Sequence, residues 1–147
     1  MKHRKTGRQF GRVRSQRKAL LHSLLSSLFI YGRIETTEAK AKETKDVVDT
    51  LITKAKRANG SQMEIARKLQ NDMSKEAISI VMENMQKFDV RVSGYARVIK
   101  LVPRKSDSAS MAIVELVDFA KKKIAKKENA QIKEVKVVKE EKTPQDK

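Results

Sequence analysis

The sequence predicts an α+β fold, a two-layer domain of about four helices packed on a small three-stranded mixed sheet. Two patterns predict it. Apolar residues recur with the helical period of 3.6 through most of residues 16–84, and from Val90 onward they alternate with the period of two that is typical of strands. Basic residues concentrate at both ends, so the chain divides into an arm (residues 1–14), a domain (15–118) and a Lys/Glu-rich extension (119–147).

The first helix is expected at about residues 16–30, where five leucines form one apolar stripe: Leu20, Leu21, Leu24, Leu25 and Leu28. Ser15 is predicted to cap its start, because a serine hydroxyl can accept a hydrogen bond from a free backbone N–H group. Gly32 is predicted to end it, because glycine enters the left-handed conformation without strain. The helix therefore buries one side and carries basic residues in its first turns.

A short strand is predicted at Arg33–Thr37, where β-branched residues alternate. A second helix should follow over residues 38–58, with Thr37 as its N-cap. Its predicted buried face consists of Ala41, Thr44, Val48, Leu51, Ile52 and Ala55.

Two shorter helices are predicted over residues 62–70 and 74–84. Their expected core residues are Met63, Ile65, Ala66, Leu69, Ile78, Val81, Met82 and Met85. Paired strands should follow over residues 95–102 and 109–117, joined by a basic, turn-rich hairpin loop over residues 103–108.

Charge is the most informative feature for function. The first 34 residues contain nine lysines and arginines and no acidic residue, whereas the middle of the chain is close to neutral. A segment so one-sided repels itself and suits a dense array of negative charge, of which nucleic-acid phosphates are the commonest. Gly7 and Gly11 would let the backbone approach a phosphate closely. Four Phe, two Tyr and no Trp are too few to stack several bases, so recognition of backbone and shape is expected.

Catalysis finds no support in the sequence. The absence of cysteine excludes disulfides, thiolate metal sites and cysteine nucleophiles. His3 and His22 lie in basic sequence without the carboxylate partners that a metal site needs. No Gly-rich nucleotide-binding loop is present. We therefore expect no enzyme, no metal, no cofactor and no small-molecule substrate.

A membrane association is not expected either. The apolar run over residues 20–32 is interrupted by polar residues and is too short to span a bilayer. The basic start has some likeness to a targeting segment, but its arginines are denser than targeting requires and no cleavage site of small residues follows.

Several short motifs follow one another along the chain: His3-Arg4-Lys5, Gly7-Arg8, Arg12, Arg17 with Ala19, Ser27-Leu28, residues 34–43 with Thr36-Thr37 and Lys40-Ala41-Lys42-Glu43, Leu51-Ile52-Thr53, Ala55-Lys56, Gly94-Tyr95 with Arg97, Ile99 and Lys100, and Met111-Ala112 with residues 115–118. Their order and spacing resemble the bacterial family of large-ribosomal-subunit protein seventeen. Gln16 stands where the family often has His, and Ser93 and Ser106 where it often has Gly. The resemblance covers about residues 1–118 and leaves the extension without a role.

The resemblance implies a structural component of the large ribosomal subunit. It implies contacts with 23S ribosomal RNA and neighbouring ribosomal proteins, on the solvent side near the polypeptide exit region, and a cytoplasmic location in the ribosome. One alternative from another class is a free DNA-compacting or regulatory protein, which would need a groove-reading helix. Another is an organellar homologue with a targeting start.

The basic side chains are the candidate RNA contacts. Those of the arm and the first helix are Lys2, His3, Arg4, Lys5, Arg8, Arg12, Arg14, Arg17, Lys18 and His22. Secondary contacts are expected on the second helix, the strand at 95–102 and the hairpin loop, at Lys40, Lys42, Arg97, Lys100, Arg104 and Lys105. Arginines suit this role because a guanidinium group can bind a phosphate through two parallel hydrogen bonds.

Overall fold

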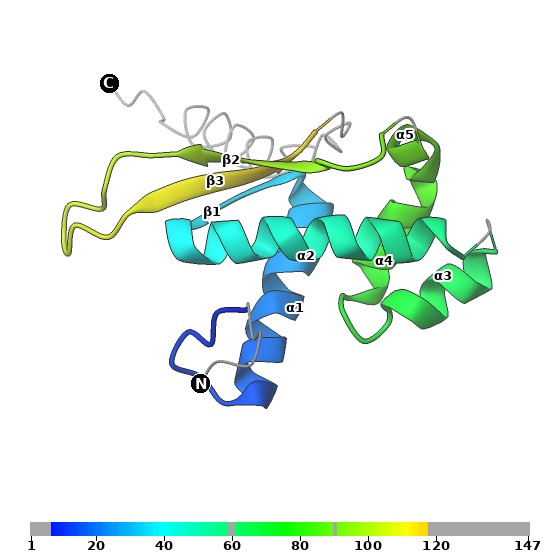
Figure 1. Cartoon of the computed structure of the whole chain (residues 1–147), viewed down its shortest axis with the longest axis horizontal. Coiled ribbons are helices and arrows are strands. Elements are labelled where there is room, and N and C mark those ends of the chain that lie inside the picture. Colours follow the sequence, from blue (N-terminus) through cyan, green and yellow to red (C-terminus); the bar gives the residue numbers. More distant parts are fainter. Residues whose placement is uncertain (1–6, 59–60, 90, 118–147) are drawn as a thin grey trace, which may run out of the picture.

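Two layers make up the domain, which a computed structural model describes for residues 7–58, 61–89 and 91–117. Figure 1 shows the sheet above α1, α2, α3 and α4, with α5 at the level of the sheet on the right. The elements are α1 (Arg14–Tyr31), β1 (Arg33–Thr37), α2 (Glu38–Lys56), α3 (Gln62–Leu69), α4 (Lys75–Glu83), α5 (Met85–Asp89), β2 (Ala96–Lys100) and β3 (Met111–Leu116). The predicted α+β class is confirmed. The predicted extension (119–147) and the first six residues of the arm lie outside the described residues.

The sheet has the strand order β1-β3-β2, and both pairings are antiparallel. The prediction of a mixed sheet is therefore wrong in this respect. Strand β3, last in sequence, inserts between β1 and β2, which would be parallel neighbours if they touched. Arg33 and Arg97 both stand opposite Glu115, one on each side of β3. Residues that stand opposite one another share a face of the sheet, so Arg33, Glu115 and Arg97 lie together on its outer face. The alternate residues of β3, Ala112, Val114 and Leu116, are buried and point to the helices.

Helix boundaries follow backbone hydrogen bonds more than side-chain caps. Gly32 ends α1 as predicted, with a φ of 75°, and its N–H donates to the Leu28 carbonyl over 2.8 Å. The predicted cap at Ser15 is wrong, because α1 starts one residue before it, with Val13 as N-cap. Thr37 does precede α2, but its side chain makes no capping bond.

The core centres on α2. All six residues predicted for its buried face are buried. Leu25, Leu28 and Phe29 of α1 are buried in the same core. The earlier leucines of the predicted stripe, Leu20, Leu21 and Leu24, are only half-buried. The N-terminal half of α1, to which Leu20 and Leu21 belong, projects below the body in Figure 1.

The two short helices add to this core through one face each. Ile65 and Leu69 of α3 and Ile78 and Val81 of α4 are buried, as predicted. The prediction for Met63 is wrong, since it is 66% exposed on the outer side of α3. The five-residue helix α5 was not predicted, and it buries Phe88 against Tyr95 with the rings edge to face.

Tyr95 fixes the connection between α5 and β2. Its ring is buried, and its hydroxyl donates to the carbonyl oxygens of Arg91 and Val92 at 2.8 and 3.0 Å. Its backbone N–H donates to Asp49 Oδ1 on α2 over 3.0 Å. The sheet is thus joined to α2 by polar bonds as well as by apolar packing.

Substitution of Leu51 by Ala should lower the free energy of unfolding by about 2–5 kcal/mol, because it leaves a cavity at a fully packed position. The Met63→Ala variant should stay within about 0.5 kcal/mol of the unaltered protein, because that side chain is exposed. Urea unfolding followed by circular dichroism measures both. Equal losses in the two variants would contradict this description of the core.

Candidate RNA interface

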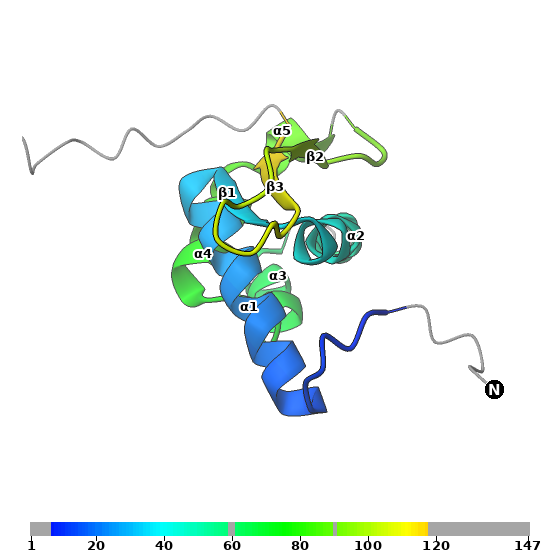
Figure 2. The same cartoon turned by 90° about the vertical axis from the view of Figure 1, so that its left-hand side faces the viewer.

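The described part of the arm, residues 7–13, turns back beside α1 toward α2, as the dark blue segment shows in Figures 1 and 2. Phe10 and Gly11 have φ values of 56° and 62°, both in the left-handed region. The N–H of Arg12 donates to the Gln9 carbonyl over 3.2 Å and closes the turn. A residue with a side chain would be strained at the φ of Gly11. The turn therefore favours glycine at this position, in addition to the predicted close approach of the backbone to a phosphate.

A three-residue cluster, which we call the Glu43 clasp, holds the arm to the body. The Arg8 N–H donates to both Glu43 carboxylate oxygens at 3.3 Å. The guanidinium of Arg17 on α1 donates through Nη2 to Glu43 Oε1 over 2.8 Å and through Nε to the Arg8 carbonyl over 2.5 Å. The clasp therefore joins the arm, α1 and α2.

The basic side of α1 faces a pocket of about 260 Å³ between this helix and the α3–α4 connection. Arg14, Lys18 and His22 line it together with Arg17, and Leu21 and Leu25 provide apolar lining. Lys18 is exposed and His22 is half-buried. Four predicted contact residues are thus brought together on one helix face.

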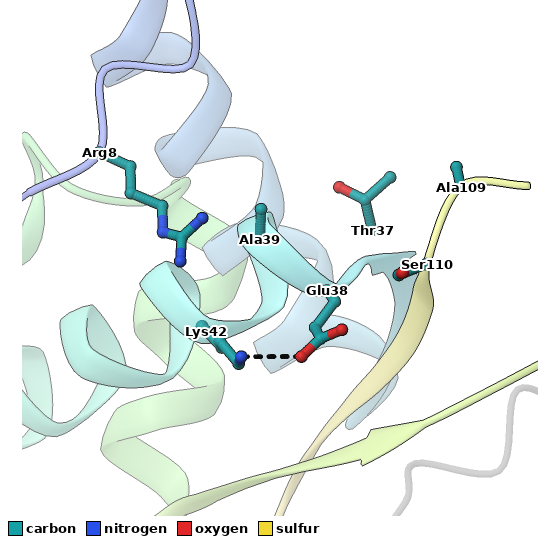
Figure 3. Close-up of a pocket in the computed structure, with 7 residues that line it drawn as sticks. All are labelled: Arg8, Thr37, Glu38, Ala39, Lys42, Ala109 and Ser110. Atoms are coloured by element: carbon teal, nitrogen blue, oxygen red, sulfur yellow. Dashed lines mark ion pairs between the residues drawn. The ribbon is translucent and has the colours of Figure 1, made fainter. Parts of the chain in front are cut away.

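A second pocket, of about 410 Å³, lies where the arm passes the N-terminal end of α2 (Figure 3). Arg8 and Lys42 line it beside Glu38. Glu38 Oε1 lies 2.7 Å from Lys42 Nζ and 3.4 Å from Lys100 Nζ. Hydrogen bonds from Lys42 and then Lys100 hold the pKa of Glu38 below its usual range. One acid therefore sits between two predicted contact residues and reduces the positive charge that they present.

The hairpin loop holds its own arginine in place. Arg104 donates to Asp107 through Nε (2.9 Å) and Nη2 (2.6 Å). The Arg104 guanidinium, and then the Ala109 N–H, lower the pKa of Asp107 to about 2. Lys105 is exposed in the same loop. This loop offers an oriented arginine and an exposed lysine.

The remaining predicted contacts are dispersed. Arg97 is paired with Glu115 on the outer face of the sheet, away from the helices. Lys40 is half-buried on α2, and Arg12 donates to the Phe10 carbonyl at 3.0 Å while staying exposed. Lys2, His3, Arg4 and Lys5 lie outside the described residues.

Glu43 was missed by the sequence reasoning about function. Its partners lie 26 and 35 residues away along the chain, so no local pattern could reveal the contact. The one available signal was its position in the motif Lys40-Ala41-Lys42-Glu43.

Two further observations concern other kinds of site. Within residues 7–58, 61–89 and 91–117, no three His, Asp or Glu side chains are grouped so that they could hold a metal ion. Across the same described ranges, no helix has the length and hydropathy needed to cross a bilayer.

The fold and the charge distribution define a small basic α+β protein, whose neutral core carries cationic side chains on an arm, a helix end and a hairpin loop. Residues 20–117 match the family model described as Ribosomal protein L17. The chain is 46% identical to the large ribosomal subunit protein bL17 of Chlorobium limicola over 122 residues, which cover 82% of this chain and 79% of the relative. The same protein of Chlorobaculum parvum is 48% identical, over 82% of this chain and 77% of its own.

The chain belongs to the ribosomal protein L17 family. It is a structural protein of the large ribosomal subunit, which confirms the predicted family and the prediction that the protein is not an enzyme. The predicted cytoplasmic, ribosomal location is confirmed by the same membership. The family model starts at residue 20, so most of the basic segment lies before the matched region.

The geometry of the hairpin loop predicts that Asp107 titrates with a pKa of about 2. Replacing Arg104 by Gln should raise that pKa toward 3.8, the ordinary value, because the first cause of the shift is removed. Because the pKa is lowered by folding, the bond stabilises the loop above about pH 3.8 and is lost as the pH falls through about 2. Carboxyl-carbon NMR measures this directly. An Asp107 pKa that the substitution leaves unchanged would contradict the described pairing.

Proposed function

We propose that this protein binds 23S ribosomal RNA through three surfaces: the basic arm, the basic side of α1, and the hairpin loop. The observation that carries the proposal is that residues 1–34, which comprise the arm, α1 and the start of β1, contain nine lysines and arginines and no acid, whereas the middle of the chain is close to neutral. Each phosphate that a lysine or arginine neutralises releases condensed counterions and so strengthens binding.

The residues differ in the role proposed for them. Arg12, Arg14 and Lys18 are exposed, so their charges can reach phosphates without breaking a strong internal pair. Lys42 and Lys100 share Glu38 and would act as weaker, secondary contacts. Arg104 is oriented by Asp107, and an oriented guanidinium loses less side-chain freedom when it binds a phosphate.

The C-terminal half of α1 supports an RNA-binding role over a groove-reading one. Leu25, Leu28 and Phe29 are committed to the core, and the lysines and arginines of α1 all lie in its first turns. A free DNA-binding protein would need a helix that reads the major groove, usually in a dimer. We further propose a position near the polypeptide exit on the solvent side, beside other large-subunit proteins, on the basis of the family resemblance.

The triple variant Arg12→Ala, Arg14→Ala, Lys18→Ala should bind 23S ribosomal RNA more weakly and with a smaller salt dependence. Each lost phosphate contact should reduce the slope of log K against log salt by about 0.7–0.9. Filter binding over a series of salt concentrations measures affinity and slope together.

The matched control is Arg67→Ala, Lys68→Ala, Lys75→Ala, which removes the same charge from exposed positions on α3 and α4. The slope of log K against log salt should differ from that of the unaltered protein by no more than about 0.7–0.9, the value for one phosphate contact. If both triple variants lose affinity and slope equally, net charge alone drives binding and the proposed surface is wrong.

A further inference from the structure

Glu43 is an acid held against the most basic part of the protein, and its side chain is only 13% exposed. Both of its oxygens accept the Arg8 N–H, and one also accepts Nη2 of Arg17. Arg17, 27% exposed, returns a bond from Nε to the Arg8 carbonyl. Peptide groups on both sides of Arg8 are thus fixed to α1 and α2 at once.

Gly7 fits closely over this cluster. A Cβ atom at Gly7 would lie 2.6 Å from Nη2 of Arg17 and 3.1 Å from Oε1 of Glu43. The first distance is shorter than real Cβ contacts, so any side chain at this position would displace the Arg17 guanidinium. Glycine at this position leaves the end of the flexible Arg17 side chain free to reach Glu43.

Elementary electrostatics makes this acid a cost for RNA binding, because it neutralises Arg17 and repels phosphates. The clasp can offset this cost by ordering the arm before RNA binds. A free arm loses conformational entropy when it binds, and a segment already fixed in place loses less. The clasp holds the segment between Arg8 and the start of α1 against the body before RNA binds.

We propose that Glu43 is a positioning residue for RNA recognition, which acts through Arg8 and Arg17 by fixing the arm to α1 and α2. This inference rests on the proposed RNA-binding function. It also changes the role of Arg17, which holds the arm in place and leaves direct phosphate contact to Arg12, Arg14 and Lys18.

The clasp itself is tested in the free protein. The chain has no cysteine, so spin labels can be attached at Gln9→Cys on the arm and Ser79→Cys on α4, both exposed positions. Pulsed electron spin resonance should give a narrow distance distribution, which broadens in the Glu43→Gln and Gly7→Ala variants. Glu64→Gln, whose carboxylate pairs with Lys68 on α3, is the control and should leave the distribution narrow. An equally broad distribution in the unaltered protein would overturn the clasp.

The consequence for RNA is tested by affinity for deproteinised 23S ribosomal RNA and for poly(U). Glu43→Gln and Glu64→Gln raise the net charge equally, so charge alone predicts slightly tighter binding by both. If Glu43 positions the arm, the Glu43→Gln variant should bind 23S RNA about 3- to 10-fold more weakly than the unaltered protein. Its affinity for poly(U) should not fall. Gly7→Ala should weaken binding in the same direction with no change of charge, which separates positioning from electrostatics.

The outcomes distinguish the inference from the function on which it rests. If Glu43→Gln retains the affinity of Glu64→Gln for 23S RNA, the role of Glu43 is overturned and the proposed function stands. If the unaltered protein shows no preference for 23S RNA over poly(U), the proposed function fails, and the role of Glu43 fails with it. Circular dichroism of each variant checks that the fold is retained.

Discussion

The insertion of β3 between β1 and β2 is the constraint on which the rest of the structure depends. The backbone of β3 and of the preceding Ser110 reaches both ends of β1, where this strand joins α1 and α2. The Leu116 N–H donates to the Gly32 carbonyl over 3.0 Å at the end of α1, and the Glu38 N–H donates to the Ser110 carbonyl over 2.9 Å at the start of α2. The last strand thereby fixes the relation between the two long helices. It also brings Lys100 of β2 beside Glu38 and Lys42.

This arrangement separates the apolar core from the charge. The sheet and the buried faces of the helices enclose aliphatic residues around α2, and Tyr95 connects β2 to α2 through Asp49. Cationic groups are left on the arm, the first turns of α1 and the hairpin loop. Two acidic residues near these groups form ion pairs with them: Glu38 pairs with two lysines, and Asp107 pairs with Arg104. Glu43 differs because its partners belong to two other segments of the chain.

Local patterns predicted much of the fold. The strand Arg33–Thr37 has the predicted bounds because its β-branched alternation is local, and the buried face of α2 follows from helical periodicity. Gly32 ended α1 for the predicted reason. The misassigned cap at Ser15 and the exposed Met63 show where composition misleads, since each residue type fits its predicted role but the tertiary packing does not use it. The strand order depends on contacts between distant segments, which no local pattern contains. The basic surfaces were predicted as sets of residues, whereas the Glu43 clasp depends on folding and was not predicted.

Directed cleavage of RNA in assembled subunits tests the central claim most directly, that the arm lies against 23S ribosomal RNA. A hydroxyl-radical-generating iron chelate would be attached at Gln9→Cys, and in a parallel sample at Ser79→Cys on α4. Reconstituted large subunits that contain each protein would then be analysed by primer extension. We predict strong, localised cuts in 23S RNA from position 9 that are distinct from any produced from position 79. Subunits that contain the labelled protein but show no cleavage from position 9 would contradict the account.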